Sequence, residues 1–187
     1  MAFNVNDFKS GLRFGGARSS LFEVTIETPA TVPSVPTAPV LVRAAQIPDA
    51  TINTLTQTYF GRQIKYAGNR TFADWTVTIL NDEDFQIRNA METWSNQINL
   101  HEGNTRLPGM VSTEGATSYK QVATVKQFGK EGDLLRTYEF VGIYPTNVAL
   151  MEVSWDQDAI QEFQVTFAYD YWKVATGGGS TTNTVAG

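Results

Sequence analysis

Residues 68–82 read GNRTFADWTVTILND, and they combine a turn, an alternating strand and the start of a helix. Trp75, Val77 and Ile79 fall on one face of a strand predicted over 72–80, because side chains alternate between the two faces of a sheet. Asn81 is a favourable helix N-cap, and the acidic residues 82–84 suit the positive end of the helix dipole. The stretch therefore predicts a strand that leads directly into a helix over about 82–98.

The predicted helix carries a single apolar stripe. Ile87, Met91, Trp94 and Ile98 recur at spacings of four, three and four residues, which places them on one side of a helix. Such a stripe is better explained by packing on a sheet than by cofactor binding. We expect Trp75 and Trp94 to join the sheet to the helix in the core.

The other regular segments are predicted strands. They span 20–27, 40–47, 119–128, 134–144, 148–153 and 160–171, with a hairpin turn at 129–133. Residues 51–70 predict a protruding hairpin-like excursion that is interrupted at Gly61 and closed near 67–69. About eight strands and one flanking helix indicate a mainly β protein, a β-sandwich or barrel. The predicted core residues are Phe22, Val24, Trp75, Val77, Trp94, Phe163 and Phe167.

The predicted domain spans residues 19–172. Glycines and basic residues in 1–18 predict a flexible N-terminal arm. Within the domain, four prolines make 28–39 an extended Pro-rich loop, and 101–117 is a polar loop. Residues 173–187 form a Gly/Ser/Thr-rich C-terminal tail that is expected to be weakly ordered.

The composition excludes several kinds of catalytic site. The chain has 187 residues, no cysteine and one histidine, His101, so it cannot form thiolate or multi-histidine metal sites within one chain. We expect no catalytic residues, no metal and no cofactor. The N-terminus lacks a signal-peptide pattern and no apolar run is long enough to span a membrane, so the expectation is a soluble protein made in a cytoplasm.

Charge is distributed unevenly along the chain. Residues 1–70 carry 7 basic and 4 acidic side chains, and residues 71–187 carry 7 basic and 15 acidic ones. The two parts therefore have net charges of +3 and −8, which sum to −5. Chance variation in surface charge can explain this asymmetry. The asymmetry would nevertheless favour head-to-tail association of identical subunits, because opposite charges attract.

A few polar and aromatic residues could suggest chemistry. Asp156 and Asp158 match a calcium loop or an acid pair only weakly, and a turn explains them better. His101 lies in the polar loop, and helix capping accounts for residues 82–84. The aromatic residues of 167–172 fit a core or a subunit interface better than a stacking platform for bases or sugars.

Three segments together resemble a known family. Residues 68–82, the segment YPTNV at 144–148 and the segment FQVTFAYDYW at 163–172 are similar to the tail tube proteins of contractile-tailed, T4-like bacteriophages, a family related to secretion-system tube proteins. The similarity runs from about Phe22 to Trp172, whereas 28–39 and the tail after Trp172 look unlike the family core.

The resemblance implies a structural role. Family members form homo-hexameric rings, in which strands join neighbouring subunits, and the rings stack into a hollow tube for genome ejection inside a contractile sheath. Sheath protein, baseplate and tape measure protein are the implied partners, and DNA passes through the lumen without specific binding. The implied location is the virion, with assembly in the host cytoplasm and no membrane.

Two sets of residues are candidates for this role. We expect the 51–70 excursion and the N-terminal arm to make contacts between rings and between neighbours, with the interface residues Tyr59, Phe60, Arg62, Lys65 and Arg70. Acidic residues would repel phosphates in a lumen, and the lumen candidates are Glu139, Glu152 and Glu162.

Other functions stay open on the sequence alone. The chain could be the tube subunit of a secretion system or of a phage-derived injection particle. A monomeric β-sandwich that binds glycans through Trp and Tyr is a different class, and it predicts a stable monomer in solution. A hydrolase that uses Asp156, Asp158 or His101 is the remote third alternative.

Overall fold

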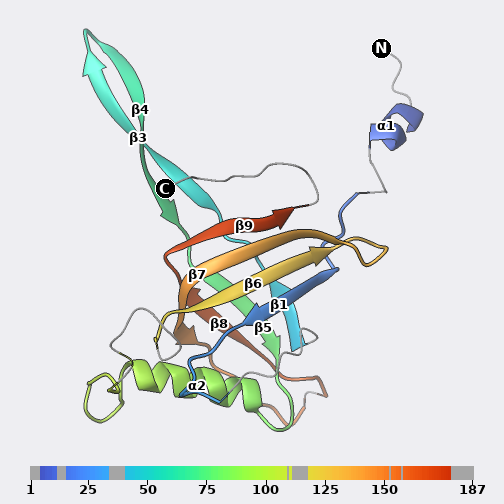
Figure 1. Cartoon of the computed structure of the whole chain (residues 1–187), viewed down its shortest axis with the longest axis vertical. Helices are drawn as coiled ribbons and strands as arrows, with labels where there is room; N and C mark the ends of the chain where they lie inside the picture. Colours follow the sequence, from blue (N-terminus) through green and yellow to red (C-terminus); the bar gives the residue numbers. More distant parts are fainter. Residues whose placement is uncertain are drawn as a thin grey trace.

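A computed structural model describes residues 5–11, 16–33, 41–108, 110, 118–151, 153–156 and 158–177 (Figure 1). In chain order its elements are α1 (Val5–Gly11), β1 (Phe22–Ile26), β2 (Val42–Ala45), β3 (Ala50–Tyr59), β4 (Arg62–Phe72), β5 (Trp75–Leu80), α2 (Gln86–Ile98), β6 (Gln121–Phe128), β7 (Leu134–Val148), β8 (Glu162–Ala168) and β9 (Tyr171–Gly177).

Strand β7 is shared by the two halves of a β-sandwich. Its first part pairs with β6 and β9, and β6 continues to β1. Its last part pairs with β8, which continues through β5 to β2. All of these pairings are antiparallel, and β1 and β2 stand at the two ends of the strand order. The prediction of a mainly β sandwich with one main helix is confirmed, and the sheet is not a closed barrel.

Gly142 marks the point where β7 passes from one half of the sandwich to the other. The register against β6 shifts there, because Gln121 pairs with Ile143 and Val122 with Val141. Gly142 has a φ of 74°, which favours glycine at a bulge. A Cβ at this position would lie 2.3 Å from Oδ2 of Asp170. The Asp170 side chain can therefore lie this close to the bend only because residue 142 is a glycine.

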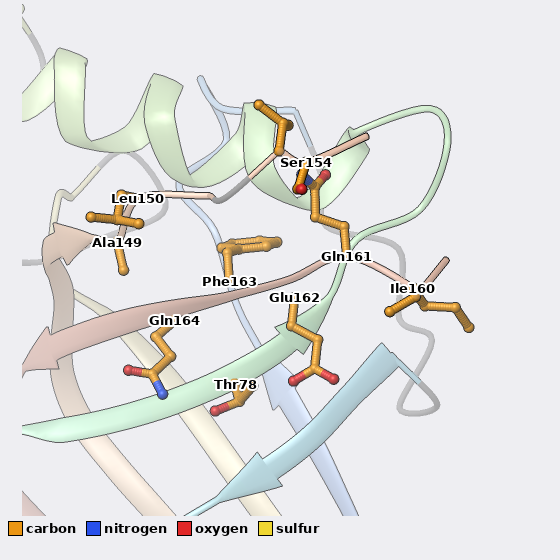
Figure 2. Close-up of a pocket in the computed structure, with 11 residues that line it drawn as sticks. Thr78, Ala149, Leu150, Ser154, Ile160, Gln161, Glu162, Phe163 and Gln164 are labelled. Atoms are coloured by element: carbon orange, nitrogen blue, oxygen red, sulfur yellow. The ribbon is translucent and has the colours of Figure 1, made fainter. Parts of the chain in front are cut away.

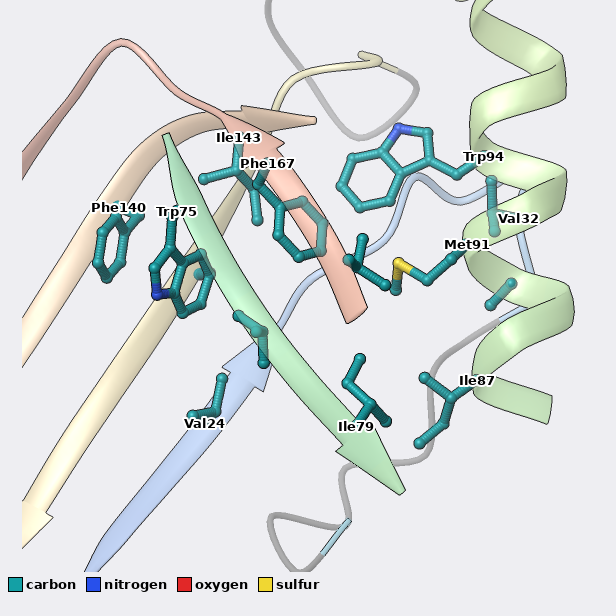
Figure 3. Packing of buried hydrophobic residues seen from close by; sticks show 14 of the residues in the cluster. Val24, Val32, Trp75, Ile79, Ile87, Met91, Trp94, Phe140, Ile143 and Phe167 are labelled. Atoms are coloured by element: carbon teal, nitrogen blue, oxygen red, sulfur yellow. The ribbon is translucent and has the colours of Figure 1, made fainter. Parts of the chain in front are cut away.

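The core lies between the two halves of the sandwich and α2 (Figure 3). The Trp75 ring stacks on Phe140 with centroids 4.3 Å apart, and Trp94 of α2 packs near Phe167. Nε1 of Trp94 donates to the Tyr119 carbonyl oxygen over 3.0 Å. Of the predicted core residues, Phe22 is only partly buried and packs at the edge of the cluster. The others are buried: Val24, Trp75, Val77, Trp94, Phe163 and Phe167.

Helix α2 begins at Gln86, later than the predicted start. The Glu83 N–H donates to Oδ1 of Asp82, and the Gln86 N–H donates to Oδ1 of Asp84. These local bonds favour a turn over an earlier helical start. Asn81 is not the N-cap; its N–H donates to the Gln161 carbonyl oxygen. The acidic residues thus precede the helix instead of forming its first turn.

The protruding hairpin turns at Phe60 and Gly61 and not near 67–69. Both residues have positive φ, 45° and 76°, as a two-residue type I′ hairpin turn requires. Residues 67–69 instead lie inside β4, where the register against β3 is irregular. A Cβ on Gly68 would lie 2.8 Å from the Asn53 carbonyl oxygen, so this glycine permits a close backbone approach and not a turn. The predicted strand over 72–80 is interrupted, since β4 ends at Phe72 and β5 begins at Trp75.

Several other boundaries differ from the sequence prediction. Strand β7 runs unbroken to Val148, and 149–151 and 153 are outside strands. The single strand predicted over 160–171 is two strands, because β9 turns back to pair with β7. Strand β9 therefore extends to Gly177, into the predicted tail, and the predicted N-terminal arm contains α1. In the Pro-rich loop Val32 is buried, while 34–40 lie outside the described residues.

Candidate assembly surfaces

The β3–β4 hairpin stands apart from the sandwich. Its strands pair only with each other, as a separate two-stranded sheet. All of β3 is exposed, and in β4 only Gly68 and Phe72 are partly covered. Figure 1 shows the hairpin extending from one end of the long axis of the molecule. Such a long exposed hairpin requires a partner or protection by charged residues.

One face of the hairpin carries an apolar strip of Leu55, Tyr59, Ile64 and Tyr66 beside the polar Gln57 and Arg62. The register pairs Leu55 with Tyr66, Gln57 with Ile64 and Tyr59 with Arg62, and these cross-strand pairs share a face. The opposite face is polar, with pairs such as Thr56–Lys65 and Thr58–Gln63. Leu55 and Tyr66 are 63% and 56% exposed. An exposed apolar strip of this kind is a candidate interaction surface.

The tip of the hairpin presents an aromatic pair. Phe60 is 89% exposed, and its ring contacts that of Tyr59 edge to face, with centroids 4.5 Å apart. A phenylalanine at a positive φ is unfavourable, so the tip holds an exposed aromatic side chain where the backbone favours Asn or Gly. The predicted interface residues Tyr59, Phe60, Arg62, Lys65 and Arg70 all lie exposed on this hairpin, and residues 50–72 contain no Asp or Glu.

The root of the hairpin is fixed to the sandwich. The Tyr169 hydroxyl donates to the Ala73 carbonyl oxygen over 2.6 Å, and its ring lies 6.0 Å from that of Phe72. Burial, together with the nearby carboxylates of Asp74 and Asp49, raises the pKa of Tyr169 to about 12. The hairpin is therefore held at its base while its outer part is free.

The structure places the two described lumen candidates on neighbouring strands, in different halves of the sandwich. Glu139 lies on β7, where Nζ of Lys173 is 3.2 Å from its Oε1. Glu162 lies on β8 and forms an ion pair with Arg43 of β2. Glu152 lies outside the described residues. The sequence did not indicate that each of the two described glutamates has a basic partner.

A groove lies on the segment that follows β7. It has a volume of about 620 Å³ and is lined by residues of 149–164 together with Thr78 of β5 (Figure 2). Four large apolar side chains of this segment are exposed: Leu150 77%, Val153 84%, Trp155 104% and Ile160 72%. Sequence reasoning missed this surface, because 148–153 was interpreted as a strand and the aspartates as a turn. The one available signal was the mixture of apolar and acidic residues without a regular period.

The residues weighed for catalysis lie at exposed loop positions. His101 lies exposed in a turn, and Asp156 and Asp158 are exposed on the loop before β8. No group of three or more His, Asp or Glu side chains among the described residues could hold a metal ion. In those same residues, no helix is long and apolar enough to cross a membrane.

Comparisons with known proteins connect this architecture to phage tails. The family model for phage tail tube proteins matches residues 17–175. Tail tube protein gp19 of Enterobacteria phage T4 is 34% identical over 133 residues, which cover 70% of this chain and 78% of the relative. The tail tube protein of Serratia phage KSP90 is 22% identical over 164 residues, 85% of this chain and 88% of the relative.

Solved structures share the fold. A chain in the cap that terminates the tube of the anti-feeding prophage matches with a TM-score of 0.63 at 18% identity, covering 86% of this chain and 91% of that one. A chain in the extended sheath–tube complex of an extracellular contractile injection system matches with a TM-score of 0.59 at 14% identity, covering 92% and 98%. At these identities the likeness concerns the fold alone.

Proposed function

The chain belongs to the phage tail tube protein family, and on that premise we propose that its copies assemble into hexameric rings that stack into a hollow tube inside a contractile sheath. The observation that carries the proposal is the β3–β4 hairpin, a long two-stranded element whose apolar face has no cover within the described chain. A free monomer gains nothing from such a face, whereas an assembled subunit can bury it.

Ring closure would use the unpaired strand edges. In the described structure β1 pairs only with β6, β2 only with β5 and β9 only with β7. An unpaired edge presents free N–H and C=O groups that a neighbouring copy can bind. Pairing of such edges around a closed ring leaves no edge exposed, which matches a cyclic assembly.

The lumen surface would carry balanced charges. The outward face of β1, β6, β7 and β9 carries an ion pair of Lys126 with Glu23 and another of Lys173 with Glu139. A face with paired charges and a net acidic chain would let DNA pass without holding its phosphates. We therefore favour Glu139 as a lumen residue, and a reconstruction of the tube that places Glu139 outside the bore would refute this.

The relatives are structural proteins, and we propose the same role here, without catalysis. The chain would reside in the virion, after assembly in the host cytoplasm with sheath, baseplate and tape measure proteins. A monomeric glycan-binding module would have the same sandwich, but it would have no use for a hairpin with one apolar face.

The test is negative-stain electron microscopy of the purified protein over a concentration series. We expect stacked rings or tubes with six-fold end views, formed spontaneously or on a baseplate seed. A variant that lacks residues 54–64, the outer part of the hairpin, is the comparison, because the hairpin is a separate sheet and we expect this deletion to leave the sandwich intact. It should fold but form no tubes. Compact monomers of the intact chain at every concentration, even with the seed, would refute the proposed function.

A further inference from the structure

The two ends of the subunit have complementary surfaces. In Figure 1 the hairpin extends from one end of the long axis, and α2 lies at the other with the loop before β8. We propose that the hairpin tip of one copy docks into the groove of residues 149–164 on the next copy along the tube. This inference rests on the proposed function, and it identifies the surface that receives the hairpin.

Apolar groups match on the two surfaces. The tip offers Tyr59 and Phe60, which are 65% and 89% exposed. The groove offers Leu150 and Ile160 at its rim. The Phe163 ring lies between the two sides of the groove in Figure 2, but it is only 2% exposed and the Arg88 guanidinium lies over it, so the rim residues would make the apolar contacts. Aromatic side chains that enter such a groove bury large areas and commonly anchor an interface. The exposed Trp155 on the same loop would cover the inserted tip.

Charge is complementary as well. The hairpin, residues 50–72, carries Arg62, Lys65 and Arg70 and no acidic residue. The groove segment, residues 149–164, contains no Lys or Arg and carries Asp156 and Asp158, both exposed. Its one described ion pair is that of Glu162 with Arg43, so these two aspartates stay available. Opposite charges of this kind fix the orientation of an encounter and raise its rate.

A second acidic strip borders the same end. The carbonyl oxygen of Gln161 accepts from the Asn81 N–H over 2.8 Å, which holds the groove segment beside the turn before α2. That turn carries Asp82, Glu83 and Asp84, all exposed. The acidic surface thus extends across both segments, and it opposes the basic hairpin at the far end of the molecule.

The geometry of the contact dictates an open stack. A hairpin that binds a different surface on an identical copy makes a heterologous contact, and such contacts form rings when they close and filaments when they do not. Because hairpin and groove lie at opposite ends of the long axis, repetition of this contact extends the assembly along that axis. Each ring would present grooves on one rim and hairpins on the other.

Phe60 provides a test that separates docking from folding. Asn is favoured over Phe at a left-handed turn position, so Phe60→Asn should leave the free subunit at least as stable as the wild type. It removes the proposed anchor, so we expect the protein concentration required for tube formation to rise about tenfold or more. Unchanged tube formation by a folded Phe60→Asn variant would overturn the proposal.

Cross-linking locates the docking site directly, since the chain has no native cysteine. The variant with Thr58→Cys and Ala159→Cys keeps both Phe60 and Ile160, and it places one exposed thiol near the hairpin tip and one in the groove lining. Treated with a short bismaleimide after assembly, it should give a ladder of covalent multimers on a denaturing gel. The matched control replaces Ala159→Cys by Lys130→Cys, on the exposed turn between β6 and β7, and should give none.

A charge exchange provides the second arm. Arg62→Glu alone and Asp156→Lys alone should each impair tube formation, and the double variant should recover it. Tubes of wild-type protein with no ladder and no recovery would refute the docking site and leave the proposed function standing. If the wild type forms no tubes even on a baseplate seed, the proposed function fails and the docking site fails with it.

Discussion

Substitution of Trp94 by Ala tests whether α2 is part of the core. Trp94 has no exposed surface, and Trp→Ala in a core costs about 3–5 kcal/mol. The substitution also leaves the Tyr119 carbonyl oxygen without the donor that it has over 3.0 Å, and such a loss costs about 1–3 kcal/mol when the acceptor is buried. We therefore expect a decrease in the free energy of unfolding in the upper part of the 3–5 kcal/mol range.

The assay is urea unfolding followed by far-ultraviolet circular dichroism, at protein concentrations below those that support assembly. Trp94→Phe is the intermediate variant, because it keeps an aromatic ring but loses the N–H donor, and it should cost less than half as much as Trp94→Ala. Trp155→Ala is the matched control, since Trp155 is 104% exposed, and it should change the stability of the free subunit by no more than about 0.5 kcal/mol.

If Trp94 is a core residue, Trp94→Ala must lower the free energy of unfolding far more than Trp155→Ala does. A cost below about 1 kcal/mol for Trp94→Ala would mean that Trp94 is not a core residue. It would place the apolar stripe of α2 on an exposed or interfacial surface instead. Equal costs for Trp94→Ala and Trp155→Ala would refute the assignment in the same way.

Three further predictions concern the bend in β7 and the hairpin root. Gly142→Ala should lower the free energy of unfolding by about 1–2 kcal/mol because of the positive φ, and further because the new methyl group must displace Asp170. Gly132 also has a positive φ but has open space around it, so urea unfolding should show a smaller decrease for Gly132→Ala. Burial raises the pKa of Tyr169 to about 12, so an absorbance titration should show an ionisation near pH 12 that is absent in Tyr169→Phe. Because the folded state holds this proton more tightly than the unfolded state, the contribution of Tyr169 to the free energy of unfolding should fall as the pH rises from about 10 towards 12. The hydrogen bond to Asp170 raises the pKa of Lys120 above 10.5, so the stability difference between wild type and Lys120→Met should be present at neutral pH and should fall at pH values above 10.5.

Local patterns predicted the central elements well. Trp75, Val77 and Ile79 alternate, and they are buried on β5. Ile87, Met91 and Trp94 recur at helical spacing, and they are the large buried residues of α2. In both cases the burial of one face is visible in the sequence, because the period of the apolar residues follows directly from the geometry of the element.

Features that depend on distant partners were not predicted. Both Gly61 and Gly68 could close a hairpin, and only the pairing of β3 with β4 shows that Gly61 lies in the turn while Gly68 lies at a bulge. Strand β9 is stabilised by pairing with the edge of β7. The Gly/Ser/Thr-rich composition that follows Trp172 gave no indication of this strand. The groove is formed by a loop without a regular period together with residues of β5 and β8, so no periodic pattern within 149–161 could reveal it.

The basic residues on the hairpin would oppose aggregation of this exposed element before assembly. Two free hairpins could pair edge to edge and aggregate. Arg62, Lys65 and Arg70 would then face like charges on the other copy, which disfavours that pairing. The same charges are attracted to the acidic end that carries Asp156 and Asp158. One set of side chains would thus disfavour the symmetric contact and favour the head-to-tail contact, and this selects a stack over a closed dimer.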